Sequence, residues 1–179
     1  METPSSPVAL ILAASAFAAH KHRDQKRKGA DAVPYINHPI AVASVLANEA
    51  GITDTATLAA ALLHDTIEDT DTTAQDLETA FGQEVAGVVV EVTDDKKLDK
   101  AERKRLQIVH APHISRRAKL VKLADKICNL RDISRSPPTD WSIERRREYF
   151  DWAKQVVDGL PKVNESMEQA FEEAWLRKP

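Results

Sequence analysis

The sequence predicts an all-α fold in a single domain. Residues that start or stop helices recur from end to end, and almost no segment shows the polar and apolar alternation expected of a half-buried strand. The chain has 179 residues, of which 42% are hydrophobic and only five are glycine. This composition is typical of a helical protein with one well-buried core. We therefore expect one compact multi-helix domain over residues 1–179.

Residues that end helices give approximate bounds for the elements. Basic residues and Gly29 end the first helix, Gly51 ends the second, and Gly82 ends the fourth. Pro137 and Pro138 stop the longest helix. The expected helices cover about residues 7–26, 37–50, 54–69, 72–81, 84–91, 102–109, 115–134, 142–158 and a last segment after Pro161.

Polar residues that can cap a helix N-terminus stand at several of these starts. Asn37 can cap the second helix, in which Pro39 suits the first turn. Thr53 or Asp54 can cap the third helix. The run Thr72-Thr73-Ala74-Gln75 has the form of a capping box for the fourth.

Composition limits the classes of partner. A net charge of −3 produces no global field toward nucleic acid or a membrane, so an anionic ligand must be held locally. The apolar run at residues 8–19 follows Glu2 instead of a basic segment and is too short to span a membrane. We interpret it as a buried first helix. Cys128 is the only cysteine, which fits a cytoplasmic location and a place in the core.

The most informative segment is Ala60–Asp69, a mostly apolar stretch that ends in a histidine and three carboxylates. Residues four apart share a helix face, so His64 pairs with Glu68, and Asp65 pairs with Asp69. Burying unpaired carboxylates is costly unless a positive group meets them. A metal ion is the simplest such group.

Two further residues could complete a metal site. His38 stands at the start of a helix, and Asp125 lies on a long helix with Asn129 four residues later. The series His38, His64-Asp65 and Asp125 resembles the H…HD…D signature of the HD superfamily of metal-dependent phosphohydrolases. The resemblance selects these partners, because their spacing alone would not.

The resemblance extends to the hydrolase domain of the RelA/SpoT alarmone enzymes, and within that group to the small stand-alone SpoT homologues of metazoa. It covers about residues 17–160 and does not include the synthetase and regulatory domains of the long enzymes. The segments that carry it are Tyr35–Pro39, His64–Asp69, Lys122–Lys126, Glu91–Lys96 and Glu102–Gln107.

Two imidazoles and two carboxylates suit Mn²⁺, Fe²⁺ or Zn²⁺ better than Mg²⁺, and the family implies one Mn²⁺ per chain. The family also implies that Glu68 and Asp69 form a catalytic acidic pair beyond the ligands. One would orient or deprotonate the attacking water and the other would protonate the leaving oxygen. The sequence leaves open which does which.

The substrate is expected to be a small anionic nucleotide. By resemblance, Arg27 stacks on the base, and Lys100 and Tyr149 lie near sugar or phosphate. Asn129 contacts substrate or orients a ligand. The full set of expected substrate-binding residues is Arg27, Lys28, Tyr35, Lys100, Asn129 and Tyr149. Lys122 and Lys126, which flank Asp125, are additional cations that could meet the substrate.

The resemblance implies hydrolysis of guanosine 3′,5′-bis(diphosphate) or the pentaphosphate to GDP or GTP and pyrophosphate. Two alternatives stay open: removal of the ribose 2′-phosphate of NADPH at the same metal, and a non-catalytic alarmone-binding module. The oligomeric state is left open.

Several polar residues have no partner pattern in the sequence. We expect Asp71 to cap a helix and the run Arg103-Lys104-Arg105 to be a solvated helix face instead of a nucleic-acid patch. Tyr149 is the expected exception on a helix whose other aromatic residues should face the core. The expected surface histidines are His20, His22, His110 and His113.

Overall fold

The computed structural model describes residues 6–29 and 31–179. Over these residues the predicted all-α fold is confirmed, because the only strand-like pairings are two isolated bridges, Lys26 with Pro34 and Gly29 with Pro138. The helices, including one π-helical segment η1, are α1 (Pro7–Lys21), α2 (Asn37–Ser44), η1 (Val45–Glu49), α3 (Thr55–Leu63), α4 (Thr66–Asp69), α5 (Ala74–Phe81), α6 (Gln83–Val92), α7 (Lys100–His110), α8 (Arg116–Arg135), α9 (Ile143–Asp158) and α10 (Glu165–Trp175).

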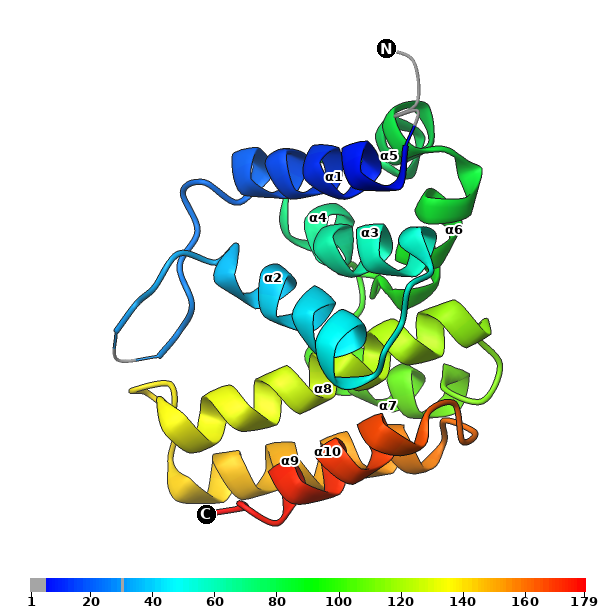
Figure 1. Cartoon of the computed structure of the whole chain (residues 1–179). Helices are drawn as coiled ribbons and strands as arrows, with labels where there is room; N and C mark the ends of the chain where they lie inside the picture. The colour runs from blue at the N-terminus through cyan, green and yellow to red at the C-terminus, as the bar shows by residue number, and fades with distance from the viewer. Residues whose placement is uncertain (1–5, 30) are drawn as a thin grey trace.

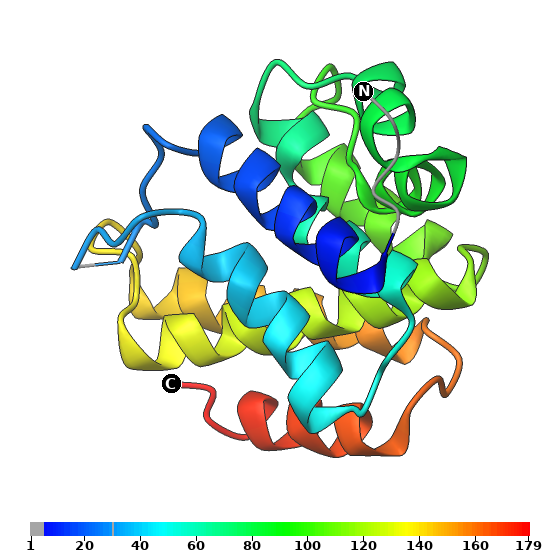
Figure 2. The same cartoon turned by 45° about the horizontal axis from the view of Figure 1, so that its top comes forward.

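The long helix α8 runs through the middle of the molecule. It packs against α2 and α3 on one side and against α9 and α10 on the other (Figure 1). In the turned view, α1 lies along α3 and covers it from outside (Figure 2). Eleven of the 20 residues of α8 are buried, so this helix joins the two sides of the molecule into one core.

Helix α3 is buried on every side and consists mostly of small residues. Ala59, Ala60 and Ala61 have no exposed surface, and Ala56 is 5% exposed. Alanine has the highest helix propensity and the smallest side chain that still packs. The backbone of α3 can therefore come close to α1, α2, α6 and α8 at once.

Side-chain caps start most of the helices and resolve the choices left by the sequence. Asp54, not Thr53, caps α3 by accepting from the Thr57 amide at 3.1 Å. The capping box of α5 pairs Thr73 with Asp76. Asn37 was expected to cap α2, but it is the first residue of that helix and has no capping bond.

Helix α1 differs from the expectation in two ways. It ends at Lys21 instead of Lys26, because the chain turns into a short hairpin that ends at Tyr35. It also buries only one face: Ala14 and Ala18 are buried, whereas Val8 is 68% and Leu12 is 64% exposed. The expected first helix is present, and its expected burial holds for one face only. Over the described residues, no helix has the length and apolarity needed to cross a membrane.

Candidate metal and substrate site

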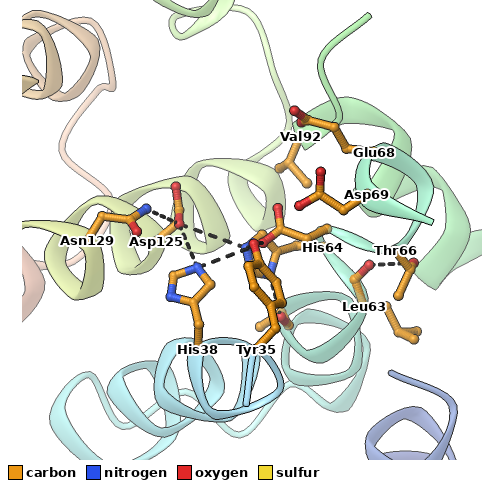
Figure 3. A network of polar contacts seen from close by, with 12 residues as sticks. Tyr35, His38, Leu63, His64, Thr66, Glu68, Asp69, Val92, Asp125 and Asn129 are labelled. Atoms are coloured by element: carbon orange, nitrogen blue, oxygen red, sulfur yellow. Dashed lines mark hydrogen bonds and ion pairs between the residues drawn. The ribbon is translucent and has the colours of Figure 1, made fainter. Parts of the chain in front are cut away.

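Three helices bring the four predicted metal ligands to one point. His38 is the second residue of α2, Asp125 lies in the middle of α8, and His64 and Asp65 connect α3 to α4. Figure 3 shows the His38, His64 and Asp125 side chains facing one another from their separate helices. The packing of α2, α3 and α8 thus assembles residues that are far apart in sequence.

The distances among these groups have the size expected around a single ion. His38 Nε2 is 3.1 Å from Asp125 Oδ1 and 3.8 Å from Asp65 Oδ2. His64 Nε2 is 3.0 Å from Asp65 Oδ2 and 3.8 Å from Asp125 Oδ1. Atoms bound at about 2.1 Å to one ion lie roughly 3.0–3.5 Å apart in octahedral or tetrahedral geometry. Small movements would therefore let one divalent cation bind all four atoms.

The orientation of His64 also fits metal ligation. Its Nδ1 lies 2.8 Å from the carbonyl oxygen of Ala61, which can only accept, so Nδ1 carries the hydrogen. In the neutral imidazole, which is the form that binds a metal, Nε2 then has the lone pair, and it is buried without a hydrogen-bond partner among the described residues. A backbone carbonyl that fixes the tautomer of a ligand histidine is common at metal sites. The residues present therefore fit the metal that the resemblance implies.

Electrostatics prepare the cluster for a cation. Burial alone would raise the pKa of both carboxyl groups, but His64 holds the pKa of Asp65 below its ordinary value, and Lys126 does the same for Asp125. Burial lowers the pKa of His38. Burial also disfavours charge on His64, yet Asp65 and Asp125 raise its pKa to about 9. Because a metal ligand must be deprotonated, cation binding at His64 releases a proton.

The helix that was expected to continue through Asp69 is interrupted at His64 and Asp65. Helix α3 ends at Leu63, whose carbonyl oxygen accepts from Thr66 Oγ1 at 2.7 Å. The four residues of α4 then form a single turn, closed by the Asp69 amide donating to the Asp65 carbonyl at 2.8 Å. This break lets Asp65 face the cluster while the next two acids contact other parts of the chain.

Glu68 and Asp69 have different surroundings. Glu68 accepts from Arg103 at 3.3 Å and from the Asp94 amide at 3.4 Å. Burial, together with the charge of Asp94, raises the pKa of Glu68 to about 7. Asp69 Oδ1 accepts from Lys96 Nζ at 2.7 Å. Figure 3 shows both side chains beyond His64, on the side away from Asn129.

A cavity of about 350 Å³ opens beside the cluster. Five of the six expected substrate-binding residues line it; the sixth, Lys100, is an exposed residue at the start of α7 and is not part of the wall. Asp69 lines the cavity, whereas Glu68 does not. The expected residues that the structure does bring together here are Arg27, Lys28, Tyr35, Asn129 and Tyr149.

A chain of polar contacts joins this cavity to the metal ligands. Arg27 donates to Asn129 Oδ1 at 2.8 Å, and Asn129 Nδ2 donates to Asp125 Oδ1 at 2.6 Å. Arg27 also bonds Asp132 at 2.8 Å, which was not predicted. On the other side, the Tyr35 hydroxyl donates to Asp65 Oδ2 at 2.6 Å. Tyr35 and Asn129 therefore hold the ligand carboxylates as well as lining the cavity.

The lysines that flank Asp125 have a different role from the one expected. Lys126 and Lys122 are only 4% and 6% exposed. Lys126 Nζ pairs with Asp125 Oδ2 at 3.0 Å and lies 4.7 Å from the ring centroid of Trp152. Lys122 Nζ donates to the Val92 carbonyl at 3.3 Å, and burial lowers its pKa to about 8. Both are structural cations of the core, not free groups for substrate.

Other expectations for polar residues need correction. His22 was expected at the surface but is 1% exposed; its four-residue spacing from the buried Ala14 and Ala18 was the available signal. Asp71 pairs with Lys21 at 2.7 Å instead of capping a helix.

The three basic side chains at the centre of α7 contact other residues of the protein. Arg103 bonds Glu68, and Arg105 pairs with Glu102 at 2.7 Å. Lys104 Nζ lies 4.9 Å from the ring centroid of Trp152. Cys128 is a free, buried thiol as expected.

A helical fold around two buried histidines and two aspartates is the arrangement of HD-type metal-dependent hydrolases. A family model described as "HD domain" matches residues 14–151. The chain therefore belongs to the HD-domain family, which confirms the resemblance noted in the sequence.

Within that family, the chain is similar over nearly its full length to named enzymes. It is 57% identical to guanosine-3′,5′-bis(diphosphate) 3′-pyrophosphohydrolase MESH1 of Xenopus tropicalis over 172 residues, or 96% of each chain. It is 56% identical to MESH1 of Homo sapiens over 173 residues, or 97% of each chain. A solved structure of a metazoan SpoT orthologue that hydrolyses ppGpp matches with a TM-score of 0.92 and 50% identity, covering 99% of this chain and 98% of that one.

Proposed function

We propose that this protein is a metal-dependent hydrolase of guanosine 3′,5′-bis(diphosphate) and the pentaphosphate, releasing pyrophosphate from the 3′ position. The observation that carries the proposal is the buried cluster of His38, His64, Asp65 and Asp125 beside a nucleotide-sized cavity. Similarity at 56% and 57% identity to enzymes named for this reaction supports the choice of substrate. We further propose one Mn²⁺ per chain as the native metal.

When bound, the ion would supply a water of lowered pKa and would neutralise charge on the phosphoryl oxygens. The residues of the chain supply the rest of the chemistry. His64, held by Ala61, presents Nε2, and Tyr35 and Asn129 each hold one ligand carboxylate. Because these groups are already held in place, less conformational entropy is lost when the reactive geometry forms.

Glu68 and Asp69 are the proposed acid–base pair. Asp69 lines the cavity, so it would act nearest to the scissile group. The pKa of Glu68, at about 7, suits a group that takes up and releases a proton near neutral pH. We propose Glu68 as a proton carrier and Asp69 as the group that orients the water or the leaving oxygen.

The wall residues provide substrate recognition. The planar guanidinium of Arg27 lies 5.6 Å from the ring centroid of Tyr35 and lines the cavity, where it can stack on a flat base. Lys28 is exposed at the cavity edge, where it would meet phosphate. Tyr149 also lines the cavity, where it would contact the sugar or a phosphate. Lys100 would act only on a substrate that extends beyond the cavity.

A comparison of substrates tests the proposal. One purified preparation with Mn²⁺ should release pyrophosphate from the alarmone, with a larger kcat/KM than that for phosphate release from NADPH. NADPH also carries a phosphorylated ribose linked to a purine. A large preference for NADPH would identify it, instead of the alarmone, as the substrate. Binding of the alarmone without turnover of either compound would identify a non-catalytic module.

We also propose that residues 1–179 form a single hydrolase domain and that the protein is cytoplasmic. The free thiol of Cys128 supports a reducing compartment. Fractionation of cells that express the protein would test this location.

A further inference from the structure

The buried His22 and the partly buried Gln25 form a polar pair outside both the metal cluster and the cavity wall. His22 is 1% exposed, at the C-terminal end of α1. Its Nδ1 lies 2.7 Å from Gln25 Oε1, and its Nε2 is buried without a partner among the described residues. Burying a polar ring with one unpartnered nitrogen costs free energy. The position therefore needs a compensating role.

The direction of the hydrogen bonds follows from the nature of the acceptors. Gln25 Nε2 lies 2.6 Å from the backbone carbonyl oxygen of Asp69. A carbonyl oxygen can only accept, so the amide nitrogen of Gln25 faces Asp69 and its oxygen faces His22. Nδ1 of His22 must then carry the hydrogen. The pair is a directed chain from the His22 ring, through the Gln25 amide, to the Asp69 carbonyl.

This chain ends on a weakly anchored element. Helix α4 has only four residues, and the last carbonyls of a helix have no partners within it. Gln25 supplies that partner for Asp69 from a segment 44 residues earlier in the sequence. Loss of the Gln25 amide would leave the Asp69 carbonyl without this bond and the side chain of Asp69 less well placed.

The same pair also contacts Tyr35. The His22 and Tyr35 rings lie with centroids 4.8 Å apart and planes inclined by 32°. The Tyr35 amide donates to the Gln25 carbonyl at 3.0 Å. Because the Tyr35 hydroxyl bonds the ligand carboxylate of Asp65, His22 supports the ring that reaches the metal cluster.

We propose that His22 and Gln25 are positioning residues. They hold the backbone of Asp69 and the ring of Tyr35 in fixed positions beside the metal cluster. The inference rests on the proposed function for its kinetic consequence only. Catalytic groups lose efficiency when they are displaced by less than 1 Å. Neither residue bonds a proposed metal ligand directly, so we expect the pair to act mainly on the rate of turnover.

Steady-state kinetics test the Gln25 contact. Gln25→Leu should lower kcat about threefold to tenfold, the equivalent of one lost hydrogen bond, while KM and the affinity for Mn²⁺ change by less than about twofold. Gln25→Glu keeps the shape and the acceptor for His22 but cannot donate to Asp69, so it should lower kcat to the same extent. Gln155→Leu, at an exposed position of α9, is the matched control. An unchanged kcat in both Gln25 variants would overturn the proposal.

Two substitutions of His22 separate its contacts. His22→Asn keeps a donor near the position of Nδ1 and loses the ring, whereas His22→Phe keeps the ring and loses the donor. Each should lower kcat less than Gln25→Leu, because each retains one of the two contacts. His20→Phe, at an exposed position of the same helix, should leave kcat unchanged. Equal effects of His20→Phe and His22→Phe would contradict the assignment.

A double-substitution cycle with Asp69→Asn tests whether Gln25 acts through Asp69. In that background Gln25→Leu should cause no further loss of kcat. If Gln25 had a merely structural role, the losses in kcat caused by Gln25→Leu and by Asp69→Asn would multiply in the double variant. This result would refute the proposal that Gln25 acts by positioning Asp69.

Nuclear magnetic resonance gives a readout that needs no activity. In ¹⁵N-labelled protein His22 should be the Nδ1-protonated tautomer, and Gln25→Leu should shift the amide signals of Asp69 and Tyr35 but not those of α10. If His22 is instead protonated at Nε2 and not at Nδ1, it does not donate to Gln25, and the proposal is wrong even if the enzyme is active. Conversely, the expected spectrum without any hydrolysis by the native chain would reject the proposed function and keep the structural coupling.

Discussion

The proposed metal cluster and the cavity wall lie side by side but are built differently. The four proposed ligand side chains come from helices or helix ends packed in the core, and they are 2–19% exposed. The wall is formed largely by two loops, the hairpin after α1 and the segment after α8, which meet at the Gly29–Pro138 bridge. Helices fix the position of a side chain through many contacts, whereas loops tolerate change. Changes in the cluster should therefore abolish the reaction, and changes in the wall should adjust it.

The largest effect is expected from removal of a ligand. His64→Ala or Asp125→Ala should lower kcat/KM by at least about 10³-fold, because the activated water depends on the ion. Metal analysis of the purified variants should show loss of the bound divalent metal. His20→Ala, which alters an exposed histidine, should retain both. Full hydrolysis by the ligand variants would show that the cluster is not the catalytic centre.

The second effect tests the contact between the two wall loops. A Cβ at Gly29 would lie 2.8 Å from the Ser136 carbonyl oxygen, so Gly29→Ala must push the loops apart. We expect KM to rise by about tenfold with kcat nearly unchanged. Gly87→Ala is the matched control, because a Cβ there meets no atom within 4 Å. If Gly29→Ala lowers kcat instead, the wall and the cluster are not independent.

The third effect concerns Glu68, which lies one residue before the wall residue Asp69 and is not itself part of the wall. Its pKa of about 7 lies above its ordinary value of 4.5, so the folded protein favours the protonated form. The contribution of Glu68 to the free energy of unfolding is therefore complete below pH 4.5 and is lost as the pH rises through about 7. In chelator-treated protein, Glu68→Gln should reduce this loss by about 1 kcal/mol, a value discounted for partial solvent exposure. Denaturant unfolding at several pH values measures it; identical pH slopes in both proteins would contradict the raised pKa.

The smallest effect distinguishes two lysines that were both expected from the sequence to bind substrate. Lys28 lines the cavity, whereas Lys100 lies outside it. Lys28→Ala should raise KM by about threefold to tenfold, the equivalent of one charged contact. Lys100→Ala should change KM by less than about twofold. A larger effect at Lys100 would place the phosphates of the substrate beyond the cavity, toward α7.

The sequence predicted the cluster better than the wall for a physical reason. Helices and caps depend on local signals, such as Asp54 before α3 and Ser115 before α8, and the resemblance to the HD superfamily supplied the proposed ligands on or beside those helices. The hairpin depends on contacts between distant segments, so its basic residues looked like the end of α1. The burial of His22 and the pairing of Lys126 with Asp125 likewise depend on neighbours that only the folded chain supplies.

The alanines of α3 lie away from every expected substrate contact, yet they constrain the reaction. Ala59, Ala60 and Ala61 have no exposed surface, and His64 follows directly after the helix. A larger side chain at any of them would move α3 away from a neighbouring helix, and with it the His64 imidazole. We therefore expect these three positions to be restricted twice, by the packing of α3 and by the placement of a proposed metal ligand.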